Sequence, residues 1–244
     1  MDTSIQTIPL ANLATIFIPV LLAVFVLYRW SLNSGQALYA LVRMVLQLML
    51  MGYCLHSIFN ADSSLIVIGV LFIMVLASSW IALGVVPSAR YRLYKYALAS
   101  IVVGGGLTLA VIVLGVLQLD PWYLPQFIIP LAGMVFANSM NSISLTAERL
   151  NAEIERNVDY LKARHIAMQA ALIPIINSLF AVGLVSLPGM MTGQILSGVS
   201  PLIAVRYQIM VMCMIFASSV LSTAYFLVLS KPIFLKQLET TESP

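Results

Sequence analysis

Charged residues are scarce in this chain, and their scarcity decides its class. Only 9% of the 244 residues are Asp, Glu, Lys or Arg, whereas 61% are hydrophobic, and the mean hydropathy is +1.01. A soluble domain carries about 25% charged residues. The composition therefore indicates an integral membrane protein built of helices, with residues 1–244 forming one transmembrane domain. The net charge of +3 gives no reason to expect a nucleic-acid partner.

Catalytic and nucleotide-binding motifs are also missing. There is no Gly-rich loop ending in Lys-Ser or Lys-Thr, no H-E-x-x-H and no G-x-S-x-G, so we do not expect this chain to hydrolyse ATP or to be an enzyme. The glycine run 104–106 lies in an apolar stretch and predicts close helix packing or a kink. Cys54 and Cys213 lie in apolar runs, where they are expected to pack rather than to form a disulfide.

Long apolar stretches follow one another along the chain. Because about 20 apolar residues cross a bilayer, we expect spans at residues 8–28, 37–59, 64–86, 97–117, 126–145, 167–187 and 202–229. The fold class is therefore all-α, a polytopic membrane protein with about seven transmembrane helices. The first stretch has no basic region before it, so we expect it to remain in the mature protein.

Lysine and arginine gather in alternate connections between these spans. The connections 29–36, 87–96 and 146–166 and the tail after residue 229 are basic, whereas 60–63 and 118–125 carry only Asp62 and Asp120. Cytoplasmic loops are enriched in Lys and Arg. We therefore expect the N-terminus outside and the C-terminus in the cytoplasm, with Arg206 as the one basic residue on the wrong side.

The fifth expected span is the most polar. Asn138, Asn141 and Ser142 are spaced i, i+3, i+4 and share one helix face. Polar residues in membrane helices either join helices or line a pathway, and the pattern leaves both alternatives open. The candidates for the lining of a translocation path are Asn138, Asn141, Ser142, Asn177, Gln194 and Ser218.

An uncharged but polar segment, Pro188–Gly198, breaks the chain between the sixth and seventh expected spans. Irregular backbone at membrane depth survives only inside protein or along a cavity. The segment is either a structured element on the outer side that controls access to a path, or an ordinary outer loop with a short amphipathic helix. Its structural or gating candidates are Pro188, Gly189, Gly193 and Gly198, and Gly189 and Gly193 would allow close backbone packing.

One charge lies inside an expected span. Arg43 is near the cytoplasmic end of the second span, and Gln47 follows one turn along on the same face. Near a helix end an arginine can snorkel to the interface. The alternative is a buried structural or gating contact made by Arg43 and Gln47.

Residues 147–166 form the charge-dense segment of the chain. Neither Gly nor Pro occurs between Met134 and Ile173, so the fifth span should continue into the cytoplasm as a helix. No residue type in the segment explains how the chain turns back. The segment is either a solvated helical extension or a contact surface for a partner protein, with the candidates Glu148, Glu153, Arg156 and Lys162.

Metal ligands are not evident. Cys54 and His56 are two residues apart, which places them about 200° apart around a helix, so they could share an ion only if the helix ended between them. Methionine thioethers could bind a soft metal, although core packing is their commoner use. The metal ligands stay unassigned, with His56, Met190 and Met191 as candidates.

Three stretches resemble the FetB family of ABC-transporter permeases: residues 42–53 (VRMVLQLMLMGY), 128–140 (IIPLAGMVFANSM) and 186–201 (SLPGMMTGQILSGVSP). These are bacterial inner-membrane proteins implicated in iron export, with plant relatives linked to aluminium tolerance. The resemblance implies a permease subunit that forms a homodimer and binds no cofactor itself. Separate ATPase subunits would bind the ATP and dock on the cytoplasmic side, where we expect residues 147–166 to be the contact. Its cargo would be a metal ion, with iron first. A permease for another small solute and a non-transporting membrane scaffold or sensor remain the alternatives.

The chain departs from this family in one place. Family members carry a longer segment, with a Leu-Gly-Ala tract, before the part that corresponds to Ala170–Pro174, whereas this chain passes directly from Arg164-His165 into IAMQAALIP. The departure concerns coupling to an ATPase and leaves the expected membrane topology unchanged.

Overall fold

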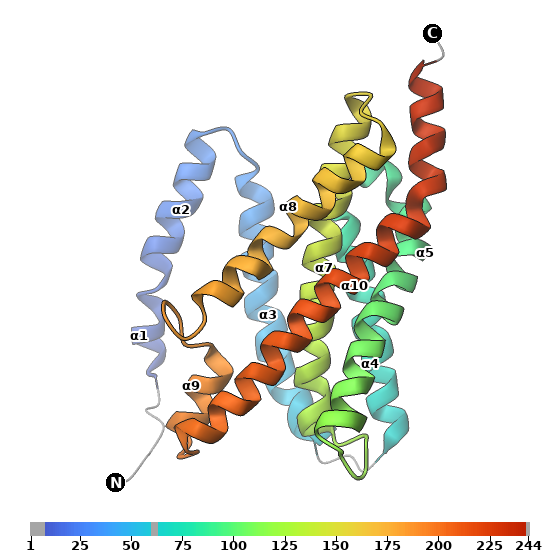
Figure 1. Cartoon of the computed structure of the whole chain (residues 1–244). Coiled ribbons are helices and arrows are strands. Elements are labelled where there is room, and N and C mark those ends of the chain that lie inside the picture. The colour runs from blue at the N-terminus through green and yellow to red at the C-terminus, as the bar shows by residue number, and fades with distance from the viewer. Residues whose placement is uncertain (1–7, 60–62, 243–244) are drawn as a thin grey trace. The chain divides into compact units, whose positions relative to one another are not determined.

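The computed structural model describes the backbone of residues 8–59 and 63–242. The regular elements in these residues are helices (Figure 1), and the only strand-like feature there is an isolated bridge between Val182 and Ser186. The chain divides into two units at residues 62 and 63. We describe each unit by itself.

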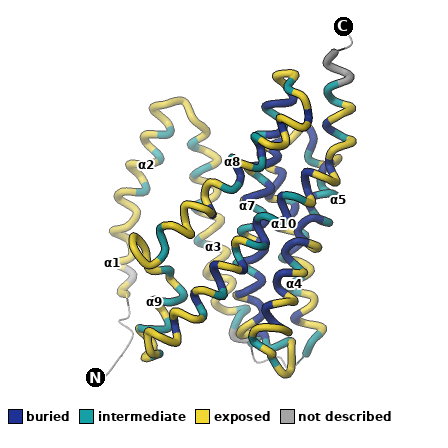
Figure 2. Tube along the Cα trace, in the orientation of Figure 1, coloured by how far each residue is buried: buried dark blue, intermediate teal, exposed yellow. Residues whose placement is uncertain are grey.

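The first unit is a helical hairpin. The short α1 (Leu10–Ala14) precedes α2 (Phe17–Arg29), which leads through a turn at Ser31 into α3 (Ser34–Phe59). α2 packs against α3, yet none of their described side chains is buried, and the tube in Figure 2 is mostly yellow here. Arg43 and Gln47 are both exposed on α3. The apolar surface of this hairpin must therefore be covered by lipid or protein.

The second unit begins with two helices joined by a tight reversal. α4 (Ser64–Ala82) ends where Arg90 donates two hydrogen bonds to the Trp80 carbonyl, at 3.1 Å from Nε and 2.6 Å from Nη2. The guanidinium also lies 3.8 Å from the centroid of the Trp80 ring. These contacts satisfy a carbonyl that the helix end leaves without a partner. α5 (Arg90–Ser100) then continues through π-helical turns at Ile101–Gly105 and Val111–Val116, which flank α6 (Gly106–Ala110).

The glycine run packs against two neighbouring helices. A Cβ on Gly104 would stand 2.5 Å from the backbone nitrogen of Ser222, and one on Gly105 would stand 3.0 Å from Cγ1 of Val135. Gly106 has nothing within 4 Å. The prediction of close helix packing is therefore confirmed for the first two glycines of the run.

The remaining helices complete the bundle: α7 (Pro125–Glu155), α8 (Tyr160–Ala181), α9 (Gly189–Leu196) and α10 (Pro201–Glu242). α7 packs against α4, α8 and α10, and α8 runs alongside α10 (Figure 1). Much of the dark blue, buried part of Figure 2 lies on α7 and α10. The core of the second unit is thus built around this pair of long helices.

The reversal between α7 and α8 has a local cause that the sequence analysis missed. α7 ends at Glu155, and Asn157 adopts a positive φ of 58°, which Asn tolerates at helix C-termini. Asp159 then caps α8 by accepting a hydrogen bond from the backbone N–H of Leu161 at 2.9 Å. The expectation that no residue explains the turn is therefore wrong, whereas the expectation that the fifth span continues as a helix into the charged segment is confirmed as far as Glu155.

Among the described residues, six helical stretches are long and apolar enough to cross a membrane: Ala11–Arg29, Ser34–Leu55, Ser64–Val85, Pro87–Val116, Pro125–Glu155 and Pro201–Leu238. The protein is therefore a multi-pass membrane protein. The expected sixth span, 167–187, is not among these stretches, because its helix begins earlier, at Tyr160, and ends at Ala181. Charged residues in the first turns of α8, such as Lys162 and Arg164, lower the mean hydropathy of this helix.

Candidate functional site

A polar cavity of about 150 Å³ lies between α7, α8 and α10. Each helix contributes one stripe of side chains at helical spacing, so the cavity follows directly from the register of the three helices. We call it the polar cavity, and its lining is Asn138, Asn141, Ser142 and Leu145 from α7, Ala171, Pro174, Ile175 and Ser178 from α8, and Met212, Ile215 and Ser219 from α10.

The polar groups of this cavity are uncharged. The Asn138 amide donates to the Met134 carbonyl at 2.8 Å, which leaves its Oδ1 oxygen as an acceptor. Ser219 is 1% exposed, and its hydroxyl has no hydrogen-bond partner among the described residues. Pro174 lacks the N–H that would bond the carbonyl of Ala170 within α8. These hydroxyl and carbonyl oxygens can replace the hydration water of a hard cation. Without a negative charge they would hold it weakly, which suits passage.

A second hollow follows along the same helix pair. This methionine pocket of about 370 Å³ is lined by Met134 of α7, Met190 and Gln194 of α9, and Met210 of α10, among others. Met134 lies one turn before Asn138 on α7, and Met210 lies just before Met212 on α10. The methionine pocket and the polar cavity therefore succeed one another along one face of α7, whereas on α10 they are lined by different faces.

Segment 188–198 is structured, with α9 at its centre. Met191 and Pro188 line a further hollow, of about 290 Å³, together with Gln208 of α10. Met190 and Met191 thus face different hollows and do not form one metal site. Gly198 has a φ of 89° after the last turn of α9, where the Val199 N–H bonds the Gln194 carbonyl at 3.0 Å. Glycine suits this position because it adopts a left-handed backbone without strain.

The close backbone packing expected at Gly189 and Gly193 is absent within the described residues. A Cβ at either glycine would meet nothing within 4 Å. Thr192 donates its hydroxyl to the Pro188 carbonyl at 3.2 Å, inside α9, rather than to another span. The side-chain oxygen of Gln194 is buried and has no hydrogen-bond partner in the part of the chain that the structure describes.

The structure brings some predicted path residues together and separates others. Asn138, Asn141 and Ser142 line the polar cavity, and Gln194 lines the methionine pocket. Asn177 is exposed and lines neither hollow, whereas its neighbour Ser178 lines the polar cavity. Ser218 is buried in the seam with α7, where its carbonyl accepts from the Ser139 hydroxyl at 3.4 Å. Both differences are shifts of one residue, or about 100° around a helix, and no sequence signal distinguishes the neighbouring polar residues Asn177 and Ser178.

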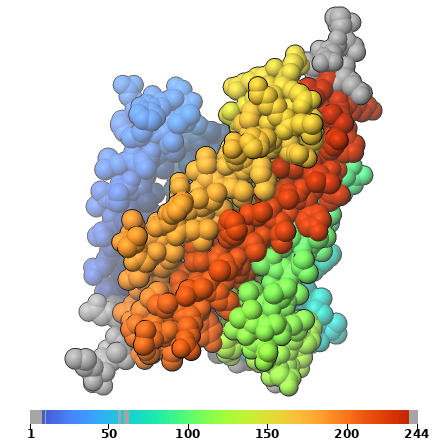
Figure 3. Space-filling model, in the orientation of Figure 1, coloured from blue at the N-terminus to red at the C-terminus, as the bar shows by residue number. Residues whose placement is uncertain are grey.

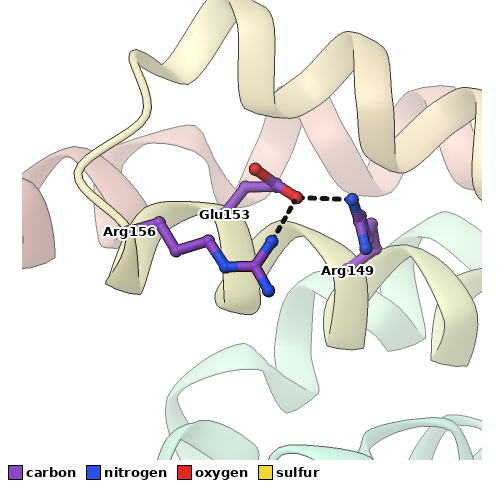
Figure 4. Close-up of polar contacts among 3 residues, drawn as sticks. All are labelled: Arg149, Glu153 and Arg156. Carbon is purple, nitrogen blue, oxygen red and sulfur yellow. Dashed lines mark hydrogen bonds and ion pairs between the residues drawn. The ribbon is translucent and has the colours of Figure 1, made fainter.

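The charged segment contains a buried carboxylate that the sequence analysis assigned to a partner contact. The Glu153 side chain is 6% exposed and pairs with Arg149 at 2.7 Å and with Arg156 at 3.4 Å (Figure 4). Glu153 therefore stabilises the end of α7 and is not available to a partner, which corrects the prediction. Glu148, Arg156 and Lys162 are exposed and remain accessible.

Tyr160 ties the start of α8 to α10. Its hydroxyl donates a hydrogen bond to the Leu227 carbonyl. Burial raises the pKa of Tyr160 to about 12, while the charge of Arg164 opposes the shift. The hydroxyl therefore stays protonated and can donate this bond at any physiological pH.

A preformed metal centre is not found in the part of the chain that the structure describes, where no three His, Cys, Asp or Glu side chains converge. The side chain of His56 lies outside the described residues. Asp62, used above for the orientation, also lies outside them.

Comparison with known proteins gives consistent relatives. The model of the uncharacterised protein family UPF0014 matches residues 10–166 and 160–234. The two matched pieces meet at 160–166, close to where the chain departs from its family. A UPF0014 membrane protein of Synechocystis is 36% identical over 82% of this chain and 84% of its own length. No solved structure matches.

Two further relatives carry descriptive names. The "Probable iron export permease protein FetB" of Escherichia coli is 32% identical over 87% of this chain and 86% of its own length. The "Protein ALUMINUM SENSITIVE 3" of Arabidopsis thaliana is 32% identical over 91% of this chain and 85% of its own length. The resemblance to FetB and its plant relatives is thereby confirmed. With most of its length matched by the family model and by relatives above 30% identity, the chain belongs to the UPF0014 family of membrane proteins.

Proposed function

We propose that this chain is the membrane-spanning permease subunit of an ABC-type transporter that exports metal ions, iron first, using ATP hydrolysed by a separate subunit. The relative FetB, whose name describes iron export, supports the cargo class. The observation that carries the proposal is the uncharged polar cavity between α7, α8 and α10, with the methionine pocket one turn away along the same face of α7. The two hollows offer hard and soft neutral ligands, without a charge that would trap the ion.

The proposed topology has seven spans, with the N-terminus outside and the C-terminus in the cytoplasm. An odd number of spans requires α8 to cross as well. After its charged first turns, residues 166–181 would cover about 24 Å of a hydrocarbon core of about 30 Å, and the mainly apolar residues 182–187 that follow would complete the crossing. Ser178 faces the polar cavity and need not contact lipid. The basic connections support this orientation, and the bacterial inner membrane is the proposed location, as for FetB-like relatives.

The proposed assembly is a homodimer with ATPase subunits on the cytoplasmic side. The exposed apolar faces of α2 and α3 and the open space beside Gly189 and Gly193 leave surface for a second copy. The exposed Glu148, Arg156 and Lys162 at the α7–α8 reversal form the proposed ATPase contact. Pro188, Gly189, Gly193 and Gly198 would then shape an access element around α9.

Filling the polar cavity tests the proposal. Ser178→Leu would place a larger apolar side chain among the cavity's oxygens, and we expect iron efflux to fall at least about tenfold, equivalent to a barrier of about 1.4 kcal/mol. The measurement is efflux from cells or vesicles that carry the chain and its ATPase at matched protein levels. Asn177→Leu, one residue away and outside the cavity, is the matched control.

The outcomes separate the candidate functions. Loss of iron efflux in Ser178→Leu with normal efflux in Asn177→Leu supports a path through the polar cavity. Normal efflux in both variants contradicts it. Because the cavity is uncharged, a neutral polar solute is the second candidate cargo, and it would gain support if wild-type vesicles moved no metal. A scaffold or sensor would show no ATP-dependent transport of any solute.

A further inference from the structure

A basic groove lies between α8 and α10, separate from the polar cavity. It has a volume of about 270 Å³ and is lined by Arg164, His165, Met168, Ala224, Leu227 and Val228. Arg164 and Met168 are one turn apart on α8, and Ala224 and Val228 are one turn apart on α10, so two facing stripes form its walls. Figure 3 shows these two helices side by side on the surface of the second unit.

Positive charge collects at one end of this groove. Arg164 and His165 are exposed, and none of the residues in the lining is acidic. Lys231 follows Leu227 by one turn on α10, and its Nζ lies 6.0 Å from the centroid of the ring of Tyr160, which precedes Arg164 by one turn on α8, so a second cation stands at this end.

The nearby carboxylates do not neutralise this charge. Glu153 is paired with Arg149 and Arg156. Asp159 is engaged as the cap of α8. A cationic cargo would be repelled from this end of the groove, and an anion would be attracted.

The rest of the groove is apolar and open to its surroundings. Met168, Leu227 and Val228 line this part, and Val228 is 62% exposed. The charged first turns of α8 give way here to an apolar stretch, so the basic end lies where the helix would leave the headgroup layer. A small soluble anion would use the cations alone and leave the apolar wall exposed.

We propose that this groove binds an anionic phospholipid, with its phosphate at Arg164, His165 and Lys231 and an acyl chain along Met168 and Val228. Basic pockets between membrane helices recognise such headgroups. The site needs only that the protein is embedded in a membrane, so it stands or falls separately from the proposed transport function.

Lipid titration of the purified full-length chain in detergent tests this site. Native mass spectrometry would compare phosphatidylglycerol with phosphatidylcholine of identical acyl chains. We expect tighter binding of phosphatidylglycerol, and Arg164→Ala should lower its affinity about five-fold, the effect of one lost cation near a membrane surface. Lys162→Ala, on the same helix but outside the groove, is the matched control and should bind as the wild type does.

A second variant tests the apolar wall without changing charge. Ala224→Phe would fill the groove beside Val228 and should also reduce phosphatidylglycerol binding. Equal binding of the two lipids, or unchanged binding in both Arg164→Ala and Ala224→Phe, would overturn the proposal. Competition by soluble glycerol phosphate as strong as that by the lipid would assign the site to free anions. Release of the ATPase by these variants with unchanged lipid binding would assign the groove to a protein contact.

Discussion

The hairpin of α2 and α3 and the bundle of α4 to α10 are both strongly apolar, but they use their apolar residues differently. The stretch Ala11–Arg29 has a mean hydropathy of 2.3 and is 0% buried, whereas Pro201–Leu238 has a mean hydropathy of 2.0 and is 50% buried. Apolarity therefore does not predict which membrane helix packs into a core. The reason is that lipid tails are as apolar as leucine and give no hydrophobic drive for helices to associate.

Small and hydroxyl-bearing residues mark the helices that do pack. In the bundle, Gly104 touches Ser222, whose hydroxyl donates to the Ser139 hydroxyl at 3.0 Å. α2, with the sequence FIPVLLAVFVLYR, has no Gly, Ser or Thr. Small residues let helix backbones approach, and hydroxyls join them where water is absent. α2 thus differs from the bundle helices in residue size and hydrogen bonding more than in hydropathy.

Replacing Gly104 with a larger residue should disrupt the helix packing of the bundle and should have the largest effect on stability. In Gly104→Leu the new Cβ would stand 2.5 Å from the Ser222 backbone nitrogen, so α10 would have to move away. We expect a loss of about 3 kcal/mol or more in the free energy of unfolding, as for severe overpacking. The measurement is stability of the purified protein in detergent, by thermal or denaturant unfolding.

Gly106→Leu provides the matched control, because this glycine has nothing within 4 Å. It should leave the bundle close to wild-type stability. Equal destabilisation by both variants would mean that the helix backbone, rather than contact with α10, requires glycine in this run.

The sequence predicted the class of the protein better than the positions of its site residues. Hydropathy was sufficient for an all-helical membrane fold, and the i, i+3, i+4 spacing of Asn138, Asn141 and Ser142 correctly placed them on one cavity wall. The rotation of α8 and α10 was not predictable from the polar residues alone. Asn177 and Ser178 are both polar, and only packing against α7 decides which one faces the cavity.

The charged reversal was misjudged for a related reason. A carboxylate flanked by arginines resembles a solvated surface in sequence, but Glu153 is buried when α7 packs against its neighbours. Asn157 and Asp159 did carry a turn signal, an αL-tolerant residue followed by a helix cap. That signal was overlooked because the segment lacks Gly and Pro.

Neutralising Glu153 should have a smaller effect than enlarging Gly104. Glu153→Gln removes the carboxylate shared by Arg149 and Arg156, but these arginine side chains are 40% and 65% exposed, so water can solvate them. We expect a loss of about 1 kcal/mol, between an exposed and a buried ion pair. Backbone hydrogen exchange of residues 150–160 should become faster.

Glu148→Lys, at an exposed position, provides the comparison. It should weaken co-purification of the ATPase without faster exchange. Weaker co-purification in Glu153→Gln but not in Glu148→Lys would instead place Glu153 on the partner surface.

Replacing Arg43 in the hairpin should have the smallest effect and decides between the two roles left open for it. The side chain is exposed on α3 and has no ion pair in the part of the chain that the structure describes. A long arginine side chain near a helix end can keep its charge in water at little cost. We therefore expect Arg43→Gln to change the unfolding free energy by no more than about 0.5 kcal/mol, as for exposed sites elsewhere. Efflux measured with matched amounts of protein should also stay near the wild-type rate.

A large loss of efflux with unchanged stability would show that Arg43 makes a functional contact, with a second copy or with the cargo. The hairpin would then be part of the working site, and its lack of buried residues would reflect a missing partner rather than lipid exposure.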